Sequence, residues 1–181
     1  GIAAENHGII RECAVYGMTV IEDIPREGIE SYVGGITGGN FGSIDSASVG
    51  KDGKGISLTA AASRVNLGGV AGWNGNSAAI RSCGDVNANL NIESSVSGNL
   101  GGIAGVNQGT LKDCAFVGWV SGNQGAEYGI GGVAGINGGG DGQALIEQCS
   151  FQGSVQGGGT ADNSESMSNT GGITGINREN G

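Results

Sequence analysis

One heptapeptide, Gly-Gly-x-x-Gly-x-Asn, recurs along the chain and constrains its fold more than any other feature. Six copies are present, the first of them degenerate, and they end at Asn6, Asn40, Asn74, Asn107, Asn137 and Asn177. The steps between these asparagines are therefore 34, 34, 33, 30 and 40 residues. A period in this range indicates stacked repeats, in which each unit buries its apolar face against its neighbours.

The heptad itself has the pattern of a short strand. Its third position is always β-branched, as in Ile36 and Val70, whereas its sixth varies from Glu5 to Trp73. Because side chains alternate across a strand, we expect positions three, five and seven to face inward and position six outward. Glycine at position five leaves room for close backbone approach. The asparagines should stack and bond to one another and to the following turn.

A second strand with a recurrent cysteine follows each heptad and its glycine turn. An aliphatic residue precedes the cysteine by three positions and a bulky one follows it by two, with two polar residues predicted to form a bend or bulge. In the third repeat Asp85 occupies the bulky position, so Val86 is expected to replace it. The position is filled by Cys13, Ala47, Cys83, Cys114 and Cys149.

The shared repeat position predicts that the cysteines stack in one column. Stacked residues lie about 4.8 Å apart, farther than the roughly 3.5–4.5 Å between the β-carbons of a disulfide. Buried free thiols are the favoured interpretation. A single disulfide between adjacent coils is the alternative.

These patterns predict an all-β fold, a parallel β-helix or β-solenoid of about six coils with two or three short strands each. We expect one domain over residues 1–181, with repeats at about 1–33, 34–67, 68–100, 101–130, 131–170 and a partial one at 171–181. Since the chain starts inside a repeat and stops just after the last heptad, we expect it to be a piece of a larger protein.

Charge and composition exclude several classes of partner. The net charge is −9, which argues against nucleic acid and anionic membranes. No apolar run approaches the roughly 20 residues that cross a bilayer, so membrane insertion is not expected. Glycine contributes 41 residues, but without the triplet period of collagen.

The heptad, its glycine turn and the aliphatic-x-x-Cys-x-aromatic strand together resemble the GLUG motif, a repeat of large exported bacterial surface proteins. These include adhesins and the non-catalytic regions of immunoglobulin A1-cleaving metallopeptidases. The resemblance covers nearly the whole chain, with five good copies. It implies a solenoid-like module on the bacterial cell surface or secreted from the cell, and it supplies no catalytic residues. The cysteine-free second copy and the 40-residue last step depart from the pattern.

The sequence offers little for catalysis or for a cofactor. His7 is the only histidine and no Cys-x-x-Cys spacing occurs, so neither a catalytic triad nor a zinc site is expected. The recurrent acidic residues Glu12, Asp45, Asp113 and Glu147 could serve a carbohydrate-active β-helix. Their neighbours Arg11, Arg81 and Lys112 favour a solvated mixed-charge ladder instead. We therefore predict no enzyme, no metal and no cofactor.

Aromatic side chains are the candidate ligand contacts. Trp73, Trp119 and Tyr128, with Tyr32 and Phe41, could form a platform for a host glycan or protein. The predicted function is adhesion, display or scaffolding. The alternatives are a polysaccharide lyase or glycosidase, and an accessory substrate-binding region of a secreted metallopeptidase. Exposed end coils predict end-to-end self-association.

Overall fold

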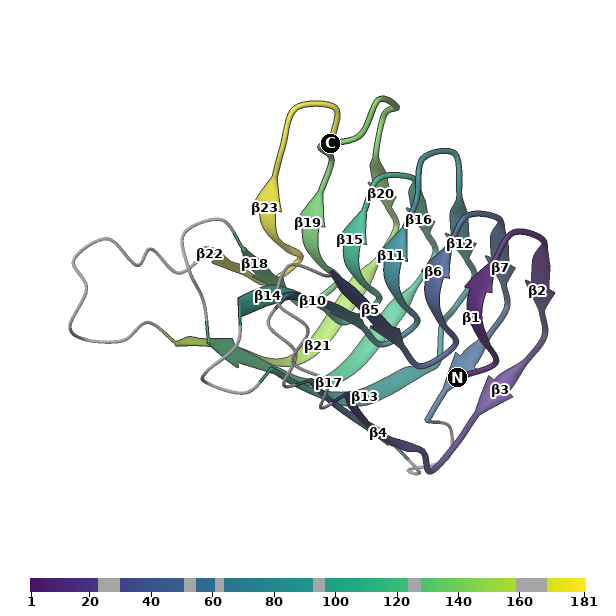
Figure 1. Cartoon of the computed structure of the whole chain (residues 1–181), viewed down its shortest axis with the longest axis horizontal. Helices are drawn as coiled ribbons and strands as arrows, with labels where there is room; N and C mark the ends of the chain where they lie inside the picture. Colours follow the sequence, from purple (N-terminus) through teal and green to yellow (C-terminus); the bar gives the residue numbers. More distant parts are fainter. Residues whose placement is uncertain (23–29, 51–54, 61–63, 93–96, 124–127, 159–168) are drawn as a thin grey trace.

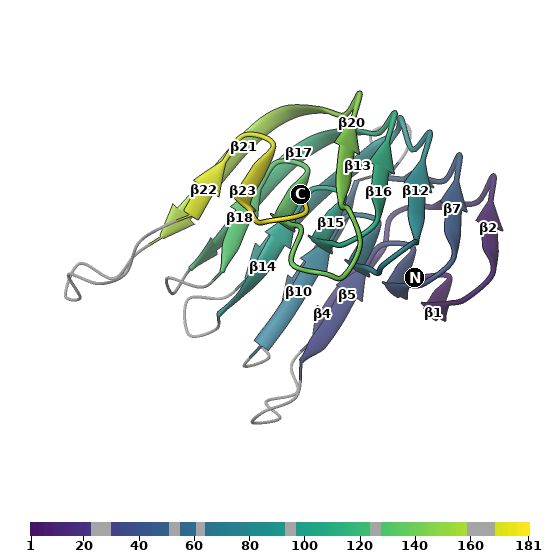
Figure 2. The ribbon, with the colours of Figure 1, turned by 90° about the horizontal axis from the view of Figure 1, so that it is seen from above.

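The protein is a parallel β-solenoid in a computed structural model that describes residues 1–22, 30–50, 55–60, 64–92, 97–123, 128–158 and 169–181. All the regular structure in these residues is β-strand. Each complete coil contributes strands to four sheets, and the strands of a sheet follow one another along the long axis of the molecule (Figures 1 and 2). None of the described residues belongs to a helix long and apolar enough to span a membrane.

The four sheets are named A to D in the order in which the chain visits them. Sheet A contains β1 (Ala3–Asn6), β6 (Thr37–Asn40), β11 (Ala71–Asn74), β15 (Ala104–Asn107), β19 (Ala134–Asn137) and β23 (Thr174–Asn177). Sheet B contains β2 (Ile9–Arg11), β7 (Ser43–Asp45), β12 (Ala79–Arg81), β16 (Thr110–Lys112) and β20 (Leu145–Glu147). Sheet C contains β3 (Ala14–Val15), β4 (Thr19–Glu22), β8 (Ser48–Val49), β9 (Ile56–Ala60), β13 (Val86–Ile92), β17 (Ala115–Asn123) and β21 (Ser150–Gly158). Sheet D contains β5 (Ser31–Gly34), β10 (Arg64–Gly68), β14 (Ser97–Gly101), β18 (Gly129–Gly131) and β22 (Asn169–Gly171).

The sequence repeat sets the register of these sheets. Equivalent heptad positions pair in sheet A, so that Asn74 lies opposite Asn40 on one side and Asn107 on the other. Every strand pair among the described residues is parallel, as in β10 with β14 and β13 with β17. The predicted parallel solenoid is therefore confirmed. The expected count of about six coils was slightly too high, because only β23 represents the sixth coil in the described residues.

Each coil has more strands than the two or three expected. The segment around each cysteine was predicted as one bent strand, but it forms two strands in different sheets, such as β16 in sheet B and β17 in sheet C. The bend between them is a corner in which one non-glycine residue takes a left-handed conformation. These residues occupy one repeat position and have φ between 52° and 55°: Glu12, Ser46, Ser82, Asp113 and Gln148. A single left-handed residue turns the backbone sharply, which starts a new sheet.

Columns of like apolar residues fill the interior. In sheet B the column is Ile44, Ile80 and Leu111, each of them fully buried. In sheet C, Val86 pairs with both Val49 and Phe116, which confirms the one-residue slip past Asp85. The β-branched third position of the heptad is buried in the four inner coils, at Ile36, Val70, Ile103 and Val133. Burying a side chain of this size contributes about 1.5–3 kcal/mol, and each inner coil repeats the contribution.

Candidate functional site

The six heptad asparagines form one hydrogen-bonded column through sheet A. The side-chain Nδ2 of each donates to Oδ1 of the asparagine in the next coil, over distances of 2.7–2.9 Å from Asn6 to Asn177. From Asn6 to Asn137 the side chains are at least nine-tenths buried. The Nδ2 groups also donate across to sheet B, as from Asn40 to the carbonyl of Ala79 at 3.2 Å. This column stabilises the join between the two sheets.

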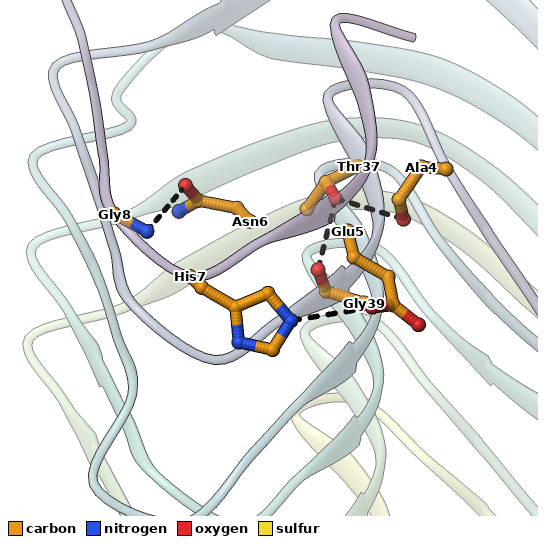
Figure 3. A network of polar contacts seen from close by, with 7 residues as sticks. All are labelled: Ala4, Glu5, Asn6, His7, Gly8, Thr37 and Gly39. Carbon is orange, nitrogen blue, oxygen red and sulfur yellow. Dashed lines mark hydrogen bonds and ion pairs between the residues drawn. The ribbon is translucent and has the colours of Figure 1, made fainter.

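The same asparagines shape the turn that follows them. The backbone N–H of Gly8 donates to Oδ1 of Asn6 at 3.1 Å (Figure 3). The backbone N–H of Gly109 likewise donates to Oδ1 of Asn107 at 3.2 Å. Both contacts are Asx-turns, which side-chain amides favour. His7 lies in the first of these turns, exposed, with its Nε2 3.2 Å from a carboxylate oxygen of Glu5 and its ring stacked on Phe41. It is a surface residue of the turn.

Glycine at heptad position five brings sheets A and D into backbone contact. A β-carbon added to Gly105 would lie 2.6 Å from the backbone nitrogen of Leu67 and 2.7 Å from the carbonyl oxygen of Gly72. Gly72 and Gly135 are packed in the same way against sheet D. The first copy has the exposed Ala4 here, and the described residues include no sheet D strand beside it that would exclude a methyl group. The two sheets therefore converge along a line of glycines.

Beside this line lies a groove of about 860 Å³ between the outer faces of sheets A and D. On sheet A its lining comes from heptad position six: Trp73, Val106, Ile136 and Ile176. On the sheet D side it is lined by Asn99, Tyr128 and Asn169, and charged side chains are supplied by Glu30, Arg64 and Arg178. Position six was expected to face outward. It does line an outer surface, but Val106 and Ile136 are only 5% and 4% exposed, because the converging sheets cover them.

One end of the groove holds an aromatic pair with a fixed carboxylate beside it. The rings of Trp73 and Tyr32 lie 5.4 Å apart at an interplanar angle of 54°. The Tyr32 hydroxyl donates to one oxygen of Glu30 at 3.1 Å, and the Asn66 amide donates to the other at 3.1 Å. Burial, followed by the charge and the hydrogen bond of Glu30, raises the pKa of Tyr32 to about 12. The phenol is therefore a neutral hydrogen-bond donor at physiological pH.

Asn66 belongs to a second, shorter asparagine column that the sequence analysis missed. Asn99 donates to Asn66 Oδ1 at 2.7 Å, and the backbone N–H of Gly129 donates to Asn99 Oδ1 at 2.9 Å. Both asparagines are nearly fully buried beneath the groove. Comparison of the repeats upstream of the heptad could have revealed this column, because Asn66, Asn99 and Asn169 each lie two residues before its first glycine.

The structure separates the aromatic residues that were expected to act together. Trp73 and Tyr128 line the groove, and Tyr32 packs against Trp73. Trp119 lies on β17 in sheet C, 42% exposed, and is not part of the groove lining. Phe41 stacks on His7. The aromatic residues therefore do not form one surface, because the groove holds Trp73 and Tyr128 but not Trp119 or Phe41; ligand contact by any of them stays a prediction.

The four cysteines are free thiols at equivalent corners of sheets B and C. Cys83 and Cys114 are buried, whereas Cys13 and Cys149 are partly exposed. The thiols of neighbouring coils interact. The hydrogen bond from Cys114 lowers the pKa of Cys83. The hydrogen bond with Cys149 acts to lower the pKa of Cys114, but the contact with Cys83 and burial together raise it to about 12. Within the described residues the column is a packed structural element.

Acidic residues of sheet B pair with basic neighbours on the opposite side of the coil from the groove lining. Arg11 lies 3.7 Å from Asp45, and Lys112 lies 2.9 Å from Glu147. Glu12 and Asp113 occupy the left-handed corners instead. Among the described residues, no group of three or more His, Cys, Asp or Glu side chains could hold a metal ion.

No protein-family model matches this chain, and neither a characterised protein nor a solved structure shows significant similarity to it.

Proposed function

We propose that this chain is a non-catalytic repeat module of an exported bacterial protein and that it binds an extended ligand in the groove between sheets A and D. The observation that carries the proposal is the groove, which joins an aromatic end at Trp73 to polar and basic residues up to Arg178. Trp73 and Ile136 lie on strands of sheet A, whereas Tyr128 and Arg178 lie directly beside strand ends, and binding surfaces are commonly built on such scaffolds. The resemblance to GLUG repeats supports the placement outside the bacterial cell.

A binding role accounts for the groove better than hydrolysis does. Glycosidases use two carboxyl groups on opposite sides of the scissile bond. Among the described residues that line the groove, Glu30 is the one carboxylate, and both of its oxygens accept hydrogen bonds from Tyr32 and Asn66. The carboxylate therefore positions the Tyr32 hydroxyl and the Asn66 amide.

The test exposes the purified chain to host glycans, acidic polysaccharides and host proteins, and measures both binding and turnover. Binding without turnover, weakened by Trp73→Ala and unaffected by Trp119→Ala, supports the proposal. The two substitutions remove the same side chain, one from the groove and one from sheet C. Turnover of any polysaccharide would favour the lyase or glycosidase alternative. Cell-surface placement is tested separately, by protease treatment of intact cells that make the protein.

A further inference from the structure

We infer that the ligand of the groove is an acidic oligosaccharide that lies along the solenoid axis, with one sugar ring on Trp73 and an acidic group near Arg178. This inference rests on the proposed binding function and specifies its ligand.

The direction of the groove follows from the residues that line it. Trp73, Val106, Ile136 and Ile176 occupy equivalent positions on four successive strands of sheet A. The groove therefore runs across the strands and spans three steps of about 4.8 Å, roughly 14 Å in all. One such step is close to the advance of one pyranose residue in an extended chain. A linear oligosaccharide can thus place successive rings over successive coils.

A peptide fits this groove less well. Peptides that bind to sheets usually add a strand to a free edge and gain backbone hydrogen bonds. Of the strands along the groove, β11, β15 and β19 in sheet A and β10, β14 and β18 in sheet D pair with a neighbour on both sides, whereas β23 and β22 end their sheets. Along the strands that pair on both sides, the backbone groups already bond to neighbouring strands, so recognition there comes from side chains. A tryptophan face flanked by amides and a fixed carboxylate suits the apolar face and the hydroxyl rim of a sugar.

The charges along the groove favour an acidic ligand. The whole chain has 17 acidic and 8 basic residues, whereas the described lining of the groove has two arginines and one carboxylate. The Glu30 carboxylate already accepts two hydrogen bonds at the aromatic end of the groove. Arg178 is exposed at the other end, where its side chain lies against Gly139. A guanidinium there can bind a carboxylate in a bidentate manner.

Tryptophan fluorescence provides a site-resolved test, since the chain has two tryptophans. Trp119→Phe leaves Trp73 as the sole reporter, and Trp73→Phe leaves Trp119. The probes are uronate and sialate oligosaccharides of two and four residues, their methyl-esterified neutral forms, and an acidic peptide of equal length. We expect the acidic tetrasaccharides to change the emission of Trp73 and not that of Trp119. The dimers and neutral esters should bind more weakly, and the affinity should fall with ionic strength.

Substitutions then locate the contacts. Variants without Trp73 lack the fluorescent reporter, so their binding is measured by calorimetry, and Trp73→Ala should weaken tetrasaccharide binding by about tenfold or more. Arg178→Gln should weaken binding of the acidic sugar but not of its ester, whereas Arg81→Gln on sheet B serves as the matched control. Melting curves of each variant report whether the fold is retained. Trp73→Phe repeats the binding measurement with an aromatic ring still present at this position.

Each outcome has a distinct meaning. Preference for uronate over sialate, or the reverse, identifies the source of the acidic group. Binding of the peptide alone, or sugar binding that is indifferent to Trp73 and Arg178, would overturn the inference while leaving a binding module. Absence of binding by every probe would also overturn it. Cleavage of a bound tetrasaccharide would refute the non-catalytic function and leave the assigned ligand class intact.

Discussion

Replacing Asn74 with aspartate tests the hydrogen-bonded column that joins the coils. Asn74 is fully buried, accepts from Asn40 at 2.8 Å and donates to Asn107 at 2.8 Å. Aspartate has almost the same shape and keeps the acceptor. It cannot donate when ionised, so a carboxylate oxygen would face Oδ1 of Asn107 and the carbonyl of Thr110. In the wild-type chain that carbonyl accepts from Nδ2 of Asn74 at 3.4 Å. The substitution therefore reverses one hydrogen-bonding role without opening a cavity.

The magnitude follows from what each variant leaves unsatisfied. Asn74→Ala removes two good hydrogen bonds, worth about 1 kcal/mol each. Their partners keep others, because Asn40 still donates to the Ala79 carbonyl and Asn107 still accepts from Gly109. We expect a loss of about 2 kcal/mol for alanine. Aspartate adds a buried charge with repelling neighbours, so we expect a loss of about 4 kcal/mol at neutral pH. For a chain of this length that is roughly 8–16 °C in melting temperature.

The pH dependence distinguishes charge from packing. Burial raises the pKa of the introduced carboxyl above its unfolded value of about 3.9. A raised folded-state pKa means that the stability deficit of the aspartate variant is largest at neutral pH and shrinks as the pH falls through the folded pKa. A protonated carboxyl can also donate to Asn107. Urea midpoints at pH 4, 5, 6 and 7 measure this trend relative to the wild-type chain.

The control is Asn89→Asp, on an exposed position of β13. It makes the same chemical change at the surface and should alter the free energy of unfolding by less than about 0.5 kcal/mol. If Asn74→Asp is no less stable than Asn74→Ala at pH 7, and its deficit does not change with pH, the column does not depend on ordered donors and acceptors.

Four further outcomes are expected. Gly105→Ala should lower the melting temperature much more than Gly84→Ala does. The added methyl group would meet backbone atoms at 2.6–2.8 Å at Gly105 but open space at Gly84. Equal melting curves of the two variants would contradict the convergence of sheets A and D. Tyr32 has a folded-state pKa raised to about 12, so its contribution to stability should be lost as the pH rises from about 10 through 12. Alkaline denaturation should show this loss in the wild-type chain and not in Tyr32→Phe. Iodoacetamide should modify the partly exposed Cys13 before the buried Cys83, as peptide mass mapping would show. The chain should self-associate end to end through its open coil edges, and sedimentation velocity showing only monomers at high concentration would count against this.

Much of the fold followed from repetition in the sequence. Because stacked coils place equivalent residues above one another, the heptad asparagines alone predicted the register that the pairing of Asn40, Asn74 and Asn107 displays. The buried third position and the slip to Val86 could also be inferred by comparing copies. Such local patterns are informative because every copy meets nearly the same environment. They were less informative about corners, since Glu12 and Ser82 carry no residue signal for a left-handed turn.

The sequence by itself determined the ladder, its period and its apolar columns, whereas only the tertiary structure decided which outer residues meet. The sequence offers both Trp73 and Trp119 as candidate ligand contacts and places Trp73 at the outward sixth position of its heptad. The sharp corners and the glycine contact between sheets A and D place Trp73 in a groove with Tyr128, whereas Trp119 lies on sheet C outside the groove lining. The physical reason is that alternation along a strand fixes which face a side chain occupies, but the angle between sheets depends on backbone contacts between different segments of the coil.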